Sequence, residues 1–196
     1  TVIYNGCDVE EFPGHYNPVY QPQNDFLFGL GTINAKKNFH VLPCLLAGNN
    51  FELILAGKVD LSYQDNIIKE AKKYGVEDRV KIIGTISPED KYWYYKNCKA
   101  FLLPSLAEGF GIPVIEAMTF GKPVFLSNRT SLPEIGGKLA YYFEDFNPTT
   151  MNKVFKNGLT HYAATQPSAD IIRHAKGFNW EKSAKAYWEV YTSLLK

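Results

Sequence analysis

Short, mainly apolar runs of residues recur along the chain from residue 25 onward, and segments of mixed polarity separate them. The runs are rich in β-branched and aromatic residues, and they lie at Phe26–Gly31, Phe51–Ala56, Val80–Ile83, Ala100–Leu103, Val124–Ser127 and Tyr141–Phe143. Continuous rather than alternating hydrophobicity is typical of strands that are covered on both faces. We therefore expect these runs to be the buried strands of a parallel sheet.

The segments between and after these runs have helical patterns. Helices are predicted at Asn38–Leu46, Tyr63–Tyr74, Pro88–Asn97, Pro113–Phe120, Ser168–Gly177 and Asn179–Leu195. Alternating strands and helices imply right-handed crossovers, so the fold class is α/β, a Rossmann-like doubly wound parallel sheet with helices on both faces. In such a fold the helix starts follow the strand ends, where open α/β sheets bind their ligands.

The first 24 residues follow neither pattern, because glycines and prolines interrupt them. We interpret residues 1–24 as a linker or the tail of an upstream domain, residues 25–178 as the α/β domain, and residues 179–196 as a C-terminal helix. The length of 196 residues suits one domain with a full core.

Composition and charge exclude several classes of protein. Hydrophobic residues make up 45% of the chain and charged residues 21%, which argues against disorder, and the net charge of +1 without a basic stripe argues against nucleic-acid binding. Three scattered cysteines exclude a disulfide framework. No apolar run reaches about 18 residues and no signal peptide begins the chain. We expect a cytoplasmic protein, either free or held peripherally at the inner face of a membrane.

The most informative stretch is a glycine-containing turn between a strand and a helix. Gly109 and Gly111 allow the backbone to approach a ligand closely. The amides around Phe110, Gly111 and Ile112 would then point outward at a helix N-terminus, where a phosphate is favoured. This turn is therefore a candidate phosphate site.

Two carboxylates flank this turn. Glu108 precedes it and Glu116 is expected in the first turn of the following helix, so both can face one crevice. A carboxylate beside a diphosphate makes chemical sense if it accepts hydrogen bonds from a vicinal diol. The alternative is an ordinary helix start with a stabilising acid in its first turn.

A second candidate loop leaves the first strand through glycines. Its Gly29-Leu30-Gly31 start resembles a dinucleotide-binding turn, but Asn34 stands where the third glycine is needed, and no acid ends the second strand. We therefore exclude NAD. Lys36 and Lys37 would instead neutralise a diphosphate and stabilise charge on a departing one, the alternative being a solvated helix start.

The remaining reactive side chains predict neither a metal nor a nucleophile. The four histidines are dispersed, and none has a cysteine or carboxylate at metal-ligand spacing. Ser105 follows a strand but lacks the flanking glycines of a nucleophile elbow. Tyr92–Tyr95 and Cys98 are expected in the core, and His174 is expected to be structural.

Together these motifs resemble the retaining glycosyltransferases of the glycosyl transferases group 1 family (family four), which have two Rossmann-like domains in a GT-B fold. Glu108–Glu116 looks like the family's Glu-(seven residues)-Glu motif. Further matching landmarks follow one another in the family's order along nearly the whole chain, at 2–8, 31–38, 79–84, 95–105, 121–124, 128–134 and 178–182.

The resemblance implies two catalytic residues. Lys37 would stabilise the leaving group, and Glu108 would bind hydroxyls of the donor sugar. Glu116 would bind the ribose diol, and the amides of Gly109, Phe110, Gly111 and Ile112 would hold the diphosphate.

The resemblance also implies binding roles for the loop after the first strand and for the end of the third strand. Gly31, Thr32 and Lys36 would belong to the phosphate-binding loop, and the backbone near Ile83 and Gly84 would face the base. Many members have an arginine where this chain has Thr32, so the second cation is assigned to Lys36.

The resemblance implies the donor-binding, C-terminal half of a GT-B enzyme. That enzyme would transfer a sugar from a UDP- or GDP-sugar, GDP-mannose among them, with retention and without a metal or other cofactor. A glycan or lipid-linked acceptor would bind an N-terminal domain for which this chain has no room, so the chain alone is expected to be inactive. The alternatives are a nucleotide-sugar epimerase or hydrolase of the same fold, or a non-catalytic nucleotide-binding module.

Overall fold

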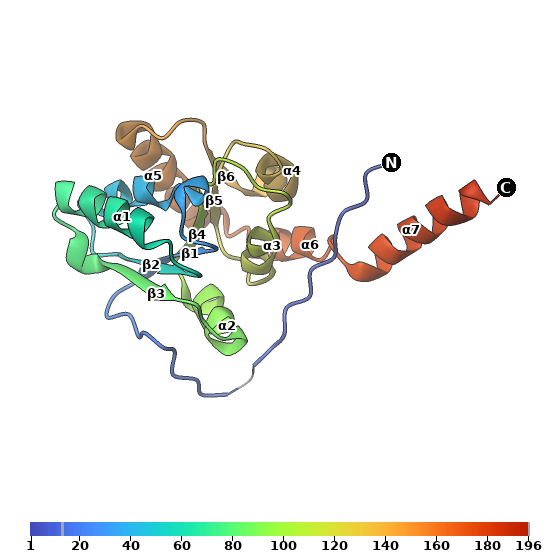
Figure 1. The fold of residues 1–196 in the computed structure, drawn as a ribbon, viewed down its shortest axis with the longest axis horizontal. Coiled ribbons are helices and arrows are strands. Elements are labelled where there is room, and N and C mark those ends of the chain that lie inside the picture. The colour runs from blue at the N-terminus through green and yellow to red at the C-terminus, as the bar shows by residue number, and fades with distance from the viewer. Residues whose placement is uncertain (13, 196) are drawn as a thin grey trace.

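A six-stranded parallel sheet forms the centre of the computed structural model, which describes residues 1–12 and 14–195 (Figure 1). The strand order is β3-β2-β1-β4-β5-β6. The strands are β1 Phe26–Leu30, β2 Glu52–Ala56, β3 Val80–Gly84, β4 Ala100–Leu103, β5 Val124–Ser127 and β6 Tyr141–Phe143. Each coincides with a predicted strand to within one residue, so the predicted doubly wound sheet is confirmed.

Helices cover both faces of this sheet (Figure 1). The α-helices are α1 Leu61–Lys73, α2 Pro88–Asn97, α3 Ile112–Thr119, α4 Leu132–Gly136, α5 Pro148–Thr165, α6 Ser168–Ala175 and α7 Trp180–Leu194, and the 3-10 helices are η1 Ala35–Lys37, η2 Phe39–Leu46, η3 Glu77–Arg79 and η4 Gly137–Leu139. On one face α1 and α5 pack against η2, and on the other α2 and α6 pack against α3.

The core lies on both sides of the central strands. Phe28 of β1 stacks on Tyr94 and meets Tyr95 edge-on, and all three side chains are fully buried. Cys98 is buried as well, and a ring nitrogen of His174 lies 2.7 Å from the carbonyl oxygen of Ile135. The core role predicted for the α2 aromatics therefore holds for Tyr94 and Tyr95, and His174 has a structural contact.

Three helical segments differ from the prediction, and the shortest of them, the five-residue α4, was not expected. The expected helix at 38–46 is a 3-10 helix that begins after Asn38, a left-handed residue, and contains Pro43, which cannot donate an α-helical hydrogen bond. Helix α5 was not predicted, because its threonines, asparagines and Gly158 are weak helix formers. Gly158 is needed there, since an added Cβ would lie 2.6 Å from the Phe125 ring.

The N-terminal segment has no helix or strand among its described residues, but it is attached to the domain. The Glu52 carboxylate accepts hydrogen bonds from the Tyr20 hydroxyl and from the amides of Gln23 and Asn24, at 2.5, 2.7 and 3.0 Å. Figure 1 shows the segment running past α2 toward α7, which projects from the body. Pro13 and Lys196, part of the predicted linker and C-terminal helix, lie outside the described residues.

Candidate functional site

The loops that follow β1 and β4 meet where the strand order reverses. These two strands are neighbours at the centre of the parallel sheet, so both loops emerge at the same edge. A backbone hydrogen bond of 2.8 Å from the Leu106 amide to the Lys36 carbonyl joins them. The structure therefore brings the lysine pair beside the glycine turn, as the sequence predicts for one crevice.

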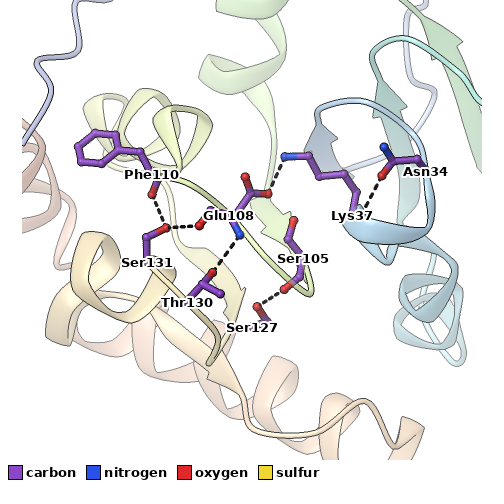
Figure 2. A network of polar contacts seen from close by, with 8 residues as sticks. All are labelled: Asn34, Lys37, Ser105, Glu108, Phe110, Ser127, Thr130 and Ser131. Carbon is purple, nitrogen blue, oxygen red and sulfur yellow. Dashed lines mark hydrogen bonds and ion pairs between the residues drawn. The ribbon is translucent and has the colours of Figure 1, made fainter.

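Lys37 reaches from the first loop to the second. Its backbone amide donates to the side chain of Asn34, which caps η1, and its Nζ lies 2.6 Å from Glu108 Oε1 (Figure 2). The two side chains are only 15% and 12% exposed. A Cβ on Gly31, whose φ is +146°, would lie 2.8 Å from Lys37 Cε. The positive φ therefore favours glycine at position 31, and a side chain there would displace the end of the Lys37 side chain.

The turn after Glu108 is held through its carbonyls and through one amide. The Glu108 amide donates to Thr130 Oγ1 at 2.9 Å, and Ser131 Oγ lies 2.9 Å from the Phe110 carbonyl and 3.2 Å from the Glu108 carbonyl (Figure 2). Among the described residues the amides of Gly109, Phe110 and Gly111 donate no hydrogen bond. These free donors precede α3, an arrangement that suits an anion.

The two lysines differ in their contacts. Lys36 and Thr32 are exposed, and within the described part of the chain Lys36 forms no ion pair, whereas Lys37 is paired with Glu108.

Ile83 and Gly84 end β3, two strands away from β1. The Gly84 carbonyl accepts a hydrogen bond from the Gly57 amide at 2.7 Å, which ties the ends of β2 and β3 together.

Glu116 lies in a different environment from the predicted one. It is the fifth residue of α3, which begins at Ile112, so its predicted place in the first turn is wrong by one residue. The residue is 7% exposed, and its carboxylate accepts hydrogen bonds from Lys91 Nζ at 2.6 Å and from the Tyr95 hydroxyl at 2.8 Å. The alternative of a helix-start acid is wrong for the same reason.

The carboxylates of Glu108 and Glu116 have different partners, Lys37 for Glu108 and Lys91 with Tyr95 for Glu116. Glu116 lines a hollow of about 200 Å³ together with Asp8, Glu10 and Phe12 of the N-terminal segment, and Glu108 is absent from its lining. Burial raises the pKa of Tyr95 well above its ordinary value, and the Glu116 carboxylate raises it further. The Tyr95 hydroxyl therefore remains a hydrogen-bond donor to Glu116.

Four residues of this site were missed from the sequence: Lys91, Tyr95, Thr130 and Ser131. Lys91 and Tyr95 are one helical turn apart on α2, so their shared face could have been predicted. Nothing in the local pattern points from Thr130 to Glu108.

The described residues contain neither a cluster of metal ligands nor a membrane-spanning helix. No group of three or more His, Cys, Asp or Glu side chains within 1–12 and 14–195 is arranged to hold a metal ion. Of the helices in that part of the chain, none is both long and apolar enough to cross a membrane.

Comparisons with known proteins agree on one family. The family model described as "Glycosyl transferases group 1" matches residues 18–176. The serotype-specific mannosyltransferase WbdA of Escherichia coli is 30% identical over 186 residues, which are 90% of this chain and 23% of that protein. The O-antigen chain mannosyltransferase B of Escherichia coli is 29% identical over 174 residues, with 84% of this chain and 45% of that protein covered.

Solved structures share the fold. A glycosyltransferase from Rickettsia africae ESF-5 superposes with a TM-score of 0.76 at 16% identity, covering 90% of this chain and 49% of that chain. Anabaena Alr3699/HepE in complex with UDP-glucose gives 0.69 at 20% identity, with 87% and 49% covered. The chain thus spans less than half the length of each of these four relatives.

Proposed function

The chain belongs to the glycosyl transferases group 1 family, and on this premise we propose that it binds a nucleoside diphosphate sugar as the donor half of a two-domain glycosyltransferase. The observation that carries the proposal is the set of free amides at Gly109–Gly111 beside Lys37 and Glu108. Amides at a helix start and a lysine suit a diphosphate, and a carboxylate suits sugar hydroxyls.

The Lys37–Glu108 ion pair leaves both partners able to bind the donor. A lysine ammonium has three N–H donors, and Glu108 occupies one, so two remain for phosphate oxygens. In the described residues only Oε1 of Glu108 is engaged by a side chain, so Oε2 is available to a sugar hydroxyl. The pair can therefore span the bond between the sugar and the diphosphate.

Transfer would break the bond between the sugar's anomeric carbon and the diphosphate oxygen. The electron pair leaves with the diphosphate, while the acceptor oxygen bonds to the anomeric carbon on the same face and its proton passes to the departing diphosphate oxygen. Lys37 and the amides of the turn would offset the charge that grows on the departing diphosphate, with no metal required in this scheme. The acceptor would bind the other half of the enzyme, and closure would complete the site.

The names of three relatives guide our choice of the donor's sugar and base. Both Escherichia coli relatives are named mannosyltransferases, and the Anabaena structure holds UDP-glucose. GDP-mannose is therefore the first donor to test, and UDP-glucose the second.

Titration of the 196-residue chain with GDP and UDP tests the proposal. We expect chemical-shift changes in the amides of Gly109–Gly111 and near Gly31 with one of the two nucleotides. Because a half-site buries less of its ligand than a closed cleft, the exchange should be fast. Glu70→Gln, which changes a carboxylate paired with Lys73 on α1, is a control that should leave the shifts unchanged. No shift change with either nucleotide would refute the proposal.

A further inference from the structure

Thr130 has an unusual backbone for its residue type. Its φ is +50°, in the left-handed region that β-branched residues rarely adopt. The residue lies in the short connection between β5, which ends at Ser127, and α4, which begins at Leu132. A strained residue persists where its surroundings over-determine it, and such residues concentrate at functional sites.

Three hydroxyl groups, from the end of β5 and from this connection, contact one segment of backbone at residues 105–110. Ser127 Oγ donates to the Ser105 carbonyl at 2.5 Å, and Ser131 Oγ lies against the Phe110 carbonyl at 2.9 Å. Between them, Thr130 Oγ1 accepts the Glu108 amide at 2.9 Å. Figure 2 shows Thr130 and Ser131 beneath the turn, with Lys37 reaching Glu108 from the other side.

This arrangement fixes which backbone groups of the turn remain available. The Glu108 and Phe110 carbonyls are turned toward Ser131, and the Glu108 amide is turned toward Thr130. The amides of Gly109–Gly111 have no partner among the described residues. An added Cβ on Gly109 would meet no atom within 4 Å, so the chain itself does not obstruct the turn there.

We propose that Thr130 is a positioning residue for the donor, an inference that rests on the proposed function. Its hydroxyl oxygen holds the Glu108 amide, so that the Glu108 carboxylate stays beside Lys37 and the following three amides stay open to a diphosphate. The left-handed backbone of Thr130 is what aims this oxygen at the Glu108 amide. The strain is thus retained for ligand binding, at the expense of stability.

Three substitutions of Thr130 distinguish the effect of its hydroxyl group from the effect of its strained backbone. Thr130→Ser keeps the oxygen acceptor without the β-methyl group, and Thr130→Val keeps the branched shape and the strain without an acceptor. Thr130→Gly removes both the acceptor and the left-handed penalty. Because Thr130 is exposed, none of these changes opens a cavity. Gln166, whose φ is +47° at the end of α5, offers a matched control as Gln166→Gly.

The test measures thermal unfolding and the Kd for GDP and UDP in the wild type and in these four variants. Thr130→Ser should bind within about 2-fold of the wild type, whereas Thr130→Val and Thr130→Gly should bind about 3- to 10-fold more weakly, the loss of one hydrogen bond. Thr130→Gly and Gln166→Gly should be at least as stable as the wild type. Of these two variants, only Gln166→Gly should keep the nucleotide affinity of the wild type.

Two outcomes overturn the inference in distinguishable ways. If the wild type binds a nucleotide and Thr130→Gly or Thr130→Val binds it equally well, Thr130 has no positioning role while the proposed function stands. If the wild type binds neither nucleotide, the proposed function fails and the role of Thr130 fails with it. Hydrogen exchange at the Glu108 amide gives a second readout, since it should accelerate in Thr130→Val and Thr130→Gly but not in Thr130→Ser.

Discussion

Replacing Glu116 should reveal a structural role in addition to any ligand role. The side chain is 9% exposed and accepts hydrogen bonds from the hydroxyl of the fully buried Tyr95 at 2.8 Å and from Lys91 Nζ at 2.6 Å. Glu116→Ala leaves the Tyr95 hydroxyl buried without an acceptor, at a cost of about 1–3 kcal/mol. The Lys91 side chain is 36% exposed and can turn to water, so its lost ion pair adds less than about 1 kcal/mol.

The expected loss for Glu116→Ala is therefore about 2 kcal/mol, or a melting temperature lower by about 4–8 °C for a domain of this size. Glu116→Gln keeps an oxygen acceptor for Tyr95 and should lose about half as much. The Tyr95→Phe background removes the stranded hydroxyl, so Glu116→Ala should cost about 1–2 kcal/mol less there than in the wild type.

Urea unfolding of the four proteins in this cycle measures these differences. An unchanged unfolding midpoint for Glu116→Ala would refute the structural reasoning. A nucleotide titration of the same variants measures the ligand role separately: Glu116→Gln should weaken binding by about 1–3 kcal/mol if its carboxylate holds a ribose diol. A stability loss with unchanged affinity would leave Glu116 as a packing residue only.

Three further outcomes are expected. In an enzyme with both halves, Lys37→Ala should lower turnover more than donor affinity, and an equal single-turnover loss for Lys36→Ala would contradict a special role for Lys37. Burial lowers the pKa of His40, so protonation of this side chain opposes folding. The free energy of unfolding in urea should be constant above pH about 6.5 and should fall below that pH. His40→Gln should remove this decrease. Trp188 is 69% exposed on α7, which also exposes Tyr191 and Leu194, so we expect the chain to self-associate through this helix. Trp188→Ser should reduce that association in sedimentation velocity without changing the melting temperature.

The sheet could be predicted because its strands are buried on both faces. In β2 every residue from Glu52 to Ala56 is buried, and four of the five, Leu53–Ala56, form an unbroken apolar run in the sequence. Helix α5 could not be found in the same way, since only Met151, Phe155 and Gly158 of its 18 residues are buried. Its start was nevertheless marked by Asn147, whose side chain caps the helix, and by Pro148 at the first position.

The site was predictable only as far as its local segments. The turn at Gly109–Gly111 and the lysines after Gly31 could be found because each follows a strand end. Their partners could not: Thr130 is 22 residues from Glu108, and Lys91 is 25 residues from Glu116. No periodicity relates positions so far apart. Thr130 meets Glu108 because the adjacent strands β4 and β5 deliver their loops to one edge, and Lys91 meets Glu116 because α2 packs against α3.

The charges around the turn explain why two lysines follow Gly31. Lys37 is neutralised by Glu108 and Lys91 by Glu116, so these pairs contribute little net charge. A diphosphate is a polyanion, and the helix start offers it only about half an elementary charge. Within the described residues Lys36 forms no ion pair, and its carbonyl is bonded to Leu106 beside the turn. We infer a division of roles: Lys37 holds Glu108 in place before the donor arrives, and Lys36 attracts the anion to the open amides.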